Sequence, residues 1–133
     1  MTGIMVPTSP GELIDKLTIL ALKAEKMTDA GKLTHVRHEQ RVLTEIADDV
    51  LPRSAALGEL WDALLEINGD LWAIEDDIRA CEARQDFGPA FVALARAVYI
   101  TNDERAAIKK RINLLLESEI VEEKSYSTPG TEG

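Results

Sequence analysis

Residues 57–81 read LGELWDALLEINGDLWAIEDDIRAC, and this stretch decides the fold. Its apolar residues recur alternately every three and four positions over about four heptads, a spacing that places side chains on one face of an α-helix. Because Ser54 is suited to an N-cap, the pattern predicts a helix from residue 54 to about Arg84, roughly 45 Å long. The apolar positions are Leu57, Leu60, Leu64, Ile67, Leu71, Ile74, Ile78 and Cys81.

Two further helices are expected before this one. Ser9-Pro10-Gly11-Glu12 combines a serine N-cap, a proline in the first turn and a glutamate placed as in a capping box, so a helix starts there. Gly31 is expected to end that helix in the left-handed conformation that glycine adopts easily. A second helix is predicted from about Thr34 to Leu51, where Pro52 stops it.

The last part of the chain follows a break at Asp86-Phe87-Gly88-Pro89 and is predicted to be helical to about Glu119. If this helix is continuous, Thr101 and Arg105 share its apolar face, and an unpaired buried arginine is costly. Arg105 would then meet a carboxylate such as Glu75 or face a ligand. We favour a third possibility, that a new helix starts at Thr101 and resets the register.

The chain shows no strand-like alternation and no hairpin turn, so the fold class is all-α. With 133 residues, 45% of them hydrophobic, it fits a single-domain helical bundle of four to five helices with one long central helix, at residues 54–84. The bundle is expected to span residues 9–124, with an N-terminal arm at 1–8 and a flexible C-terminal tail at 125–133.

Self-association is also expected from the length of this helix. A domain of this size has a radius of gyration of about 14 Å, so a helix of roughly 45 Å would project beyond it. The projecting end would expose apolar residues unless a second copy covered them. We therefore expect a homodimer.

Composition excludes several partners. A net charge of -9 disfavours binding to nucleic acids and to anionic membranes, because affinity for phosphate comes largely from lysine and arginine. No segment approaches the roughly 20 apolar residues of a membrane span, and the N-terminus lacks the basic start of an export signal. The single cysteine, Cys81, lies on the apolar face of the long helix and is expected to be reduced and buried, which favours a cytoplasmic location.

Polar residues on the long helix form the first candidate site. Asn68, Trp72, Glu75 and Arg79 are spaced by four, three and four, so they lie along one edge of the helix, where Glu75 and Arg79 could pair. One interpretation is an ion pair beside a half-buried tryptophan. The other is one wall of a polar pocket, with Trp72 as a flat surface and Arg79 as an anion clamp.

A second polar set lies on the last helical segment. Asn102, Arg105, Lys109 and Asn113 line one side of it, and this mixture of amides and cations suits a phosphate, carboxylate or sugar ligand. The two sets together would form a binding site if the two helices packed side by side.

Motifs for catalysis and metal binding are missing. His35 and His38 lack the Glu-x-x-His pairing of di-metal bundles, and most carboxylates of the long helix fall on its outward face. The sequence has no Gly-rich phosphate loop and no Gly-x-Ser-x-Gly elbow. We assign no metal ligand, no cofactor and no catalytic residue.

Several segments resemble an uncharacterised family of short helical bacterial proteins of unknown function. The similar segments are PGELIDKLTIL at 10–20, LWAIEDDIRACE at 71–82, ARAVYITNDERAAIKKRIN at 95–113 and IVEEKSY at 120–126. The resemblance brings no activity or cofactor. It implies that the following residues belong to recurring motifs: Asp15, Lys16, Glu75, Asp76, Arg79, Asn102, Asp103, Arg105, Lys109, Asn113 and the tail Lys124-Ser125-Tyr126. We add Lys16 to the candidate ligand-binding residues on this basis.

Three functions are compatible with the sequence. The one we favour is binding of a small anionic metabolite, phosphorylated or carboxylated, in a polar cleft between helices. The second is a structural or adaptor oligomer in which the polar residues form only an internal salt-bridge network. The third is a small all-α enzyme, similar to a mutase or a nucleotide pyrophosphohydrolase, with Glu75 as its acid or base.

Overall fold

The computed structural model describes residues 3–125, and side chains as far as Glu117. In this range the chain forms four helices and no strand, which confirms the all-α class. Most of the predicted C-terminal tail lies outside the described residues. The helices are α1 (Pro10–Lys26), α2 (Ala30–Val50), α3 (Ala55–Ala83) and α4 (Pro89–Ser125).

Two helix starts confirm the predicted serine N-caps, whereas the Glu12 carboxylate pairs with Lys109 and does not form the predicted capping box with Ser9. Ser9 caps α1, its hydroxyl accepting a hydrogen bond from the backbone N–H of Glu12 at 3.3 Å. Ser54 caps α3 in the same way, with the N–H of Leu57 at 3.2 Å. Each hydroxyl satisfies a backbone donor that the first turn of a helix leaves without a partner, so local sequence alone determines these two starts.

The boundary between α1 and α2 differs from the prediction. α1 ends at Lys26, and Gly31 lies in the first turn of α2 instead of ending α1. The reason is Asp29, which caps α2 by accepting a 2.9 Å hydrogen bond from the N–H of Lys32. The Asp29 cap places Gly31 inside the new helix, and no glycine in the described range has the positive φ that a glycine stop requires.

The predicted break at Thr101 was also wrong, because α4 runs through it without interruption. The preceding residues 93–98 are rich in alanine, a strong helix former, so no non-helical turn precedes Thr101. A capping sequence acts only where such a turn exists. Thr101 and Arg105 therefore share one helical register.

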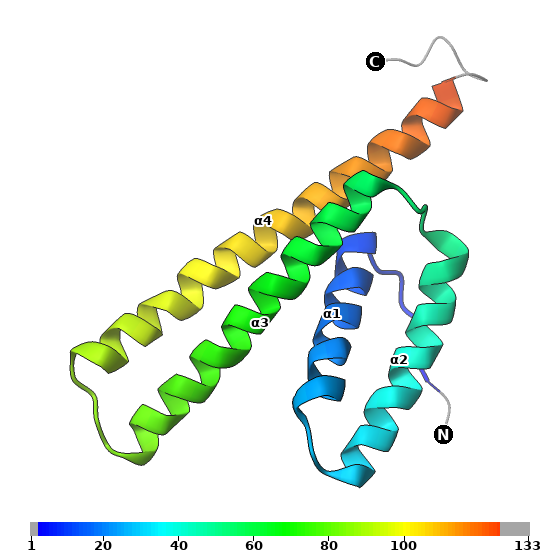
Figure 1. Cartoon of the computed structure of the whole chain (residues 1–133). Helices are drawn as coiled ribbons and strands as arrows, with labels where there is room; N and C mark the ends of the chain where they lie inside the picture. Colours follow the sequence, from blue (N-terminus) through cyan, green and yellow to red (C-terminus); the bar gives the residue numbers. More distant parts are fainter. Residues whose placement is uncertain (1–2, 126–133) are drawn as a thin grey trace.

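The four helices form two antiparallel hairpins (Figure 1). α3 and α4 lie side by side, and the shorter α1–α2 hairpin packs against the half of them that holds the start of α3. α1 contacts each of the other three helices, whereas α2 packs mainly on α1. The central position predicted for the third helix is therefore not confirmed.

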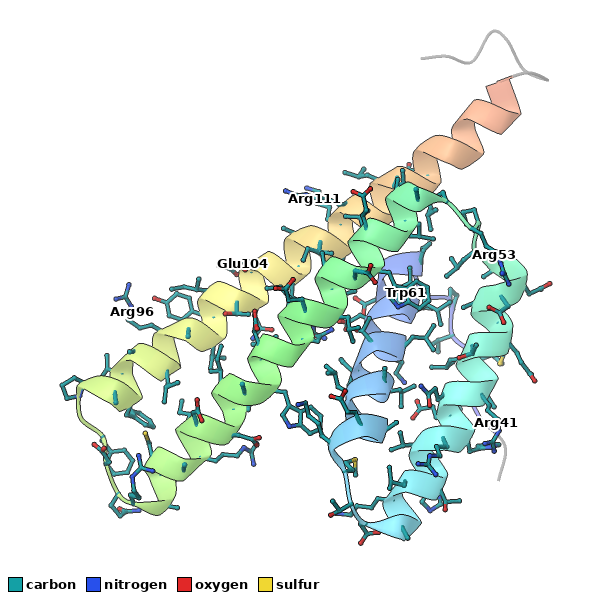
Figure 2. The ribbon with its side chains drawn as sticks, in the orientation of Figure 1. Arg41, Arg53, Trp61, Arg96, Glu104 and Arg111 are labelled. Atoms are coloured by element: carbon teal, nitrogen blue, oxygen red, sulfur yellow. The ribbon has the colours of Figure 1, made fainter. Side chains whose placement is uncertain are left out.

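The core lies where α1, α3 and α4 meet. Ile14, Leu64 and Ile112, one from each helix, are fully buried there and belong to one apolar cluster. A second cluster joins α1 to α2 through Leu17 and Ala47. Trp61 of α3 packs against both clusters, and Figure 2 shows it extending toward the α1–α2 hairpin.

The outer half of the α3–α4 hairpin, residues 70–100, is called the arm below; it is distinct from the N-terminal arm predicted at residues 1–8. Beyond Leu71 and Trp72, which line a cleft with Ile19 of α1, the described part of the chain has no other helix packed on the arm, and Cys81 is its one buried residue there (Figure 1). The apolar residues predicted for the inner face of α3, such as Ile74 and Ile78, are only half-buried here. The arm is thus a two-helix structure with a thin core.

Gly11 brings the first turn of α1 close to α4. Its N–H donates a 2.7 Å hydrogen bond to Oδ1 of Asn113, and a Cβ on residue 11 would lie 2.7 Å from the carbonyl oxygen of Lys109. Because a backbone atom cannot rotate away, we expect Gly11→Ala to lower the free energy of unfolding by about 1–3 kcal/mol in urea denaturation. Gly58→Ala in α3, where no neighbour lies within 4 Å, is the matched control, and an equal loss there would contradict this.

Gln85 has a φ of 56°, in the left-handed region. Its N–H bonds the carbonyl of Glu82, and the N–H of Asp86 bonds that of Cys81, which together form a Schellman motif at the end of α3. Since glycine adopts this conformation without a steric penalty, we expect Gln85→Gly to stabilise the fold by about 1 kcal/mol in thermal or urea unfolding. Gln85→Ala should give no such gain, and a gain of the same size would show that the backbone conformation is not the cause.

Candidate functional site

Asp15 of α1 is the buried carboxylate at the centre of the site, only 3% exposed. It follows the fully buried Ile14, and its side chain lies on the face of α1 that meets α3 and α4. Burying a carboxylate costs several kcal/mol unless cations and hydrogen-bond donors compensate for its lost hydration. When one partner of a buried ion pair is removed, the free energy of unfolding typically falls by about 3–5 kcal/mol. Its partners therefore determine how these helices join.

Arg105 of α4 is the main partner of Asp15. Its Nε donates to Oδ1 at 2.9 Å, and its Nη2 donates to Oδ2 at 2.5 Å, so the pair is bidentate. Lys109, one turn further along α4, places Nζ 3.8 Å from Oδ2 and also binds Glu12 at 2.8 Å. Two cations from α4 thus meet one carboxylate from α1.

Asn68 completes the network from α3. Its Nδ2 donates to Oδ1 of Asp15 and to Oγ1 of Thr18, both at 2.9 Å. The Thr18 hydroxyl in turn donates to the backbone carbonyl of Asp15 at 2.7 Å. Among the side chains that the structure describes, no buried nitrogen or oxygen lacks a partner. One carboxylate therefore links three helices in a fully satisfied network.

Opposing effects act on the pKa of Asp15. Burial alone would raise this pKa, because it penalises the charged form. The hydrogen bonds from Arg105 and Asn68 and the positive charges of Arg105 and Lys109 outweigh burial, and they hold the pKa of Asp15 below its ordinary value. Asp15 is therefore ionised at neutral pH.

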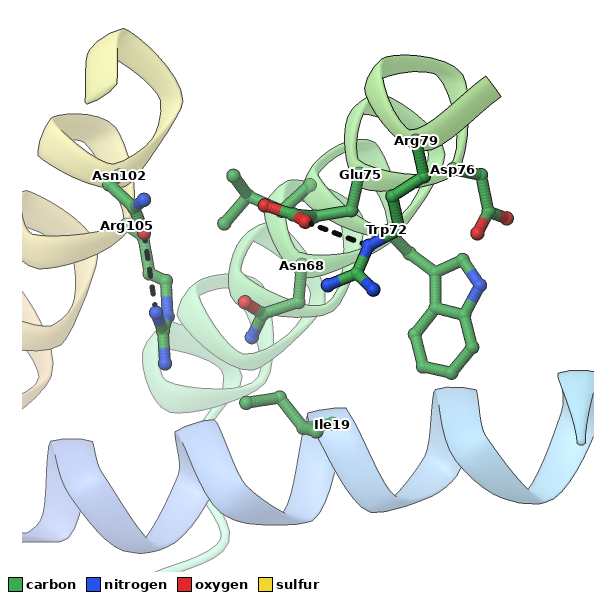
Figure 3. A pocket seen from close by; sticks show the side chains of 9 residues that line it. Ile19, Asn68, Trp72, Glu75, Asp76, Arg79, Asn102 and Arg105 are labelled. Atoms are coloured by element: carbon green, nitrogen blue, oxygen red, sulfur yellow. Dashed lines mark hydrogen bonds and ion pairs between the residues drawn. The ribbon is translucent and has the colours of Figure 1, made fainter. Parts of the chain in front are cut away.

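A cleft of about 620 Å³ opens beside this network, between α1, α3 and α4 (Figure 3). Its size is within the range of small-molecule sites. Arg105 faces it from α4, and its Nη1 donates to Oδ1 of Asn102 at 3.3 Å. The cleft is lined by Ile19 of α1, by Asn68, Leu71, Trp72, Glu75, Asp76 and Arg79 of α3, and by Asn102 and Arg105 of α4.

The predicted polar edge of α3 lies along one wall of the cleft. Trp72 is half-buried, while Glu75 and Arg79 are exposed and pair at 3.4 Å with the predicted spacing of four. One possibility stated from the sequence was that a buried Arg105 pairs with a carboxylate such as Glu75. Arg105 does pair with a carboxylate, but it is that of Asp15. Ion pairing and a pocket wall, which the sequence presented as alternatives, thus occur together.

Six of the nine candidate ligand-binding residues line the cleft, and three do not. Lys16 is exposed and pairs with Glu39 of α2 at 3.1 Å. Lys109 is held by Glu12 and Asp15, and Asn113 accepts the hydrogen bond from Gly11. These three contact α1 or α2 instead of the cleft.

Sequence reasoning did not identify Asp15 as the centre of the network, nor Ile19, Leu71 and Asp76 as residues that line the cleft. A usable signal exists in α1, where Asp15, Thr18 and Leu22 recur at three and four positions and are all buried. They form a second inward face beside that of Leu13 and Leu17. A helix with two inward faces must pack on more than one neighbour, so an acidic residue on one of them needs a buried partner.

Metal and membrane signals were sought in the described residues. No three histidine, cysteine, aspartate or glutamate side chains among them are grouped so that they could hold a metal ion. None of the helices there combines the length and the apolar character that crossing a bilayer requires.

Comparisons with known proteins add a family and no activity. The model of the family of unknown function DUF6165 matches residues 4–132. No curated protein and no solved structure shows significant similarity to the chain. The match includes α1 to α4 and all residues of the cleft.

The lowered pKa of Asp15 predicts a pH-dependent contribution to stability. A carboxyl group with a depressed pKa in the folded state stabilises the fold above its unfolded pKa, and this contribution is lost as the pH falls through the folded value. We expect Asp15→Asn to reduce the free energy of unfolding by about 3 kcal/mol at neutral pH, because Arg105 loses its counter-charge. The difference from the unsubstituted protein should narrow as the pH falls below about 4.

Urea denaturation of both proteins at a series of pH values measures this difference. Asp76→Asn is the matched control, since Asp76 is exposed on α3 and takes part in no ion pair among the described side chains. Its effect should be small at every pH. A difference for Asp15→Asn that stays constant down to a pH of about 3 would show that its charge does not stabilise the fold.

Proposed function

The chain belongs to DUF6165, a family of unknown function, so we propose its function from the cleft itself: binding of a small anionic ligand, phosphorylated or carboxylated. The observation that supports this most is that two guanidinium groups, those of Arg79 on α3 and Arg105 on α4, line the same cleft beside Trp72. Arginine binds carboxylates and phosphates with two parallel hydrogen bonds, and an indole ring offers a flat surface for the rest of a ligand.

The two arginines would act differently. Arg105 is held by Asp15 and Asn102, so its orientation is fixed before a ligand arrives, and little entropy is lost on binding. Arg79 is mostly exposed, and its single 3.4 Å contact with Glu75 is of the kind that stabilises a fold very little. Arg79 can therefore exchange Glu75 for a ligand anion at small cost.

The acidic residues of the cleft restrict the ligand class. Glu75 and Asp76 line the same wall as Arg79, and Asp15 already balances the charge of Arg105. A ligand with several negative charges would be repelled by these carboxylates. A ligand with one anionic group and an amino or hydroxyl group fits better, because the carboxylates can accept hydrogen bonds from the second group.

The alternative of a structural or adaptor oligomer without a ligand has its own support. The network around Asp15 is complete without any added molecule, and it joins three helices. In this alternative, the polar residues of the cleft only maintain the angle between the α1–α2 hairpin and the α3–α4 hairpin.

The enzyme alternative has less support. General acid catalysis near neutral pH requires a carboxyl group whose pKa is raised, whereas the pKa of Asp15 is lowered. A mutase-like or nucleotide pyrophosphohydrolase-like activity would have to depend on Glu75, and no geometry in the described residues favours it over simple binding.

The oligomeric part of the proposal is a homodimer. In the described chain, α3 and α4 extend beyond the α1–α2 hairpin, and most of the arm has no third helix packed on it (Figure 1). A second copy of the chain could cover the apolar side chains of the arm. The ligand proposal does not depend on the dimer.

A thermal-shift screen tests the ligand proposal. Compounds that carry one carboxylate or phosphate, with and without an amino group, are compared at fixed concentration. A ligand present at about 100 times its Kd should raise the melting temperature by about 10 °C. Absence of any shift across the whole screen would remove the support for a binding function.

Variants then show whether a hit occupies the cleft. Arg79→Ala should weaken the affinity at least about tenfold without changing the melting temperature of the free protein, because Arg79 is exposed. Arg37→Ala, at an exposed position of α2, is the matched control and should bind normally. In a Trp61→Phe variant, Trp72 is the remaining tryptophan, and its fluorescence should change on binding. Equal binding by both arginine variants would place the ligand elsewhere.

A further inference from the structure

α4 exposes one continuous stripe of side chains on the side away from α3. The exposed positions recur at three and four residues, so they lie above one another along the helix. Figure 2 shows two of them, Arg96 and Arg111, directed away from α3. The outer stripe of α4 consists of Val92, Ala93, Arg96, Tyr99, Ile100, Asp103, Glu104, Ala106, Ala107, Lys110, Arg111 and Leu114.

Four large apolar side chains of this stripe are exposed. Val92 is 52% exposed, Tyr99 55% and Leu114 54%, and Ile100 is exposed beside them. Phe87, in the loop before α4, is exposed at the same end of the hairpin as Val92. Large apolar side chains that gather on one face mark an interaction site more often than scattered ones do.

Five charged residues lie within the stripe, and two of them, Arg96 and Asp103, flank its centre. Arg96 and Asp103 are seven residues apart, about 10 Å along the helix, so they cannot pair with each other. Neither forms an ion pair within 4.0 Å among the described side chains, and Nε of Arg96 donates a 3.5 Å hydrogen bond to the hydroxyl of Tyr99. Tyr99 and Ile100 lie midway between the two charges.

We propose that this stripe is the interface for a second copy of the chain, with α4 packed antiparallel on α4 of the other copy about a two-fold axis near Tyr99 and Ile100. The charge order is the argument for this partner. A two-fold interface brings the same patch together in opposite directions. Arg96 then lies opposite the turn that carries Asp103 of the second copy, and the reverse pair forms at the same time.

The apolar residues match in the same arrangement. Val92 and Ala93 meet the turn that carries Ala106 and Ala107 of the second copy, where small side chains let the helices approach closely. Leu114 falls opposite the loop before α4 of the second copy. A single two-fold rotation thus covers the exposed apolar residues of α4 and of the loop before it. The cleft stays open in the dimer, because it lies on the other side of α4, toward α1 and α3.

A charge exchange tests the interface in the full chain. Sedimentation velocity over a range of about 1–200 µM, at a salt concentration of about 0.15 M, should show a concentration-dependent monomer–dimer equilibrium. Arg96→Asp or Asp103→Arg alone places like charges opposite each other twice, and each should weaken dimerisation at least about tenfold. The double variant Arg96→Asp/Asp103→Arg should restore it, because each charge regains an opposite partner.

Two controls match the single variants in charge. Arg37→Asp in α2 and Asp77→Arg in α3 change exposed residues away from the stripe, and both should dimerise normally. Circular dichroism checks that every variant is folded. A wild-type protein that stays monomeric throughout the concentration range would overturn the proposal. So would single variants that dimerise normally, or a double variant that remains as weak as the singles.

Discussion

The bidentate pair between Asp15 and Arg105 is the interaction on which the rest of the structure depends. The apolar clusters bring α1 against α3 and α4, but apolar contacts are non-directional and would tolerate small rotations of α1. The pair allows one orientation, because two parallel hydrogen bonds and the amide of Asn68 must be satisfied together. It also orients Arg105 toward the cleft, so packing and the candidate site share one cause.

Local interactions explain which parts of the fold could be predicted. Ser9 and Ser54 cap helices through backbone groups three residues away, and the three-four spacing of residues 57–81 depends on helix geometry alone. The predicted stop at Gly31 was wrong because Asp29, two residues earlier, caps α2 and places Gly31 in the first turn of that helix. The break predicted at Thr101 failed because a capping sequence inside a good helix has no non-helical turn on which to act.

The centre of the site could not be predicted in the same way, because Asp15 and Arg105 are 90 residues apart in the chain. Periodicity shows which face of a helix is buried, not which residue of another helix it meets. The sequence did restrict the possible partners of Arg105, because a buried arginine in the apolar face of a helix needs a carboxylate or a ligand beside it. Glu75 was the carboxylate named from the sequence, whereas the packing of the two hairpins gives Arg105 the carboxylate of Asp15 and leaves Glu75 paired with Arg79.

The thin core of the arm makes stability uneven along a single helix. From Ile112 toward Leu116, α4 is locked among buried residues of α1 and α3, whereas residues 89–100 have only α3 beside them. Amide hydrogen exchange reports such differences as a gradient from global to local unfolding. We therefore expect the backbone amides of α4 to exchange slowly in its C-terminal half and fast in its N-terminal half. The cleft lies at the boundary between the two halves. A molecule bound there would have the largest effect on how much of α4 takes part in local unfolding.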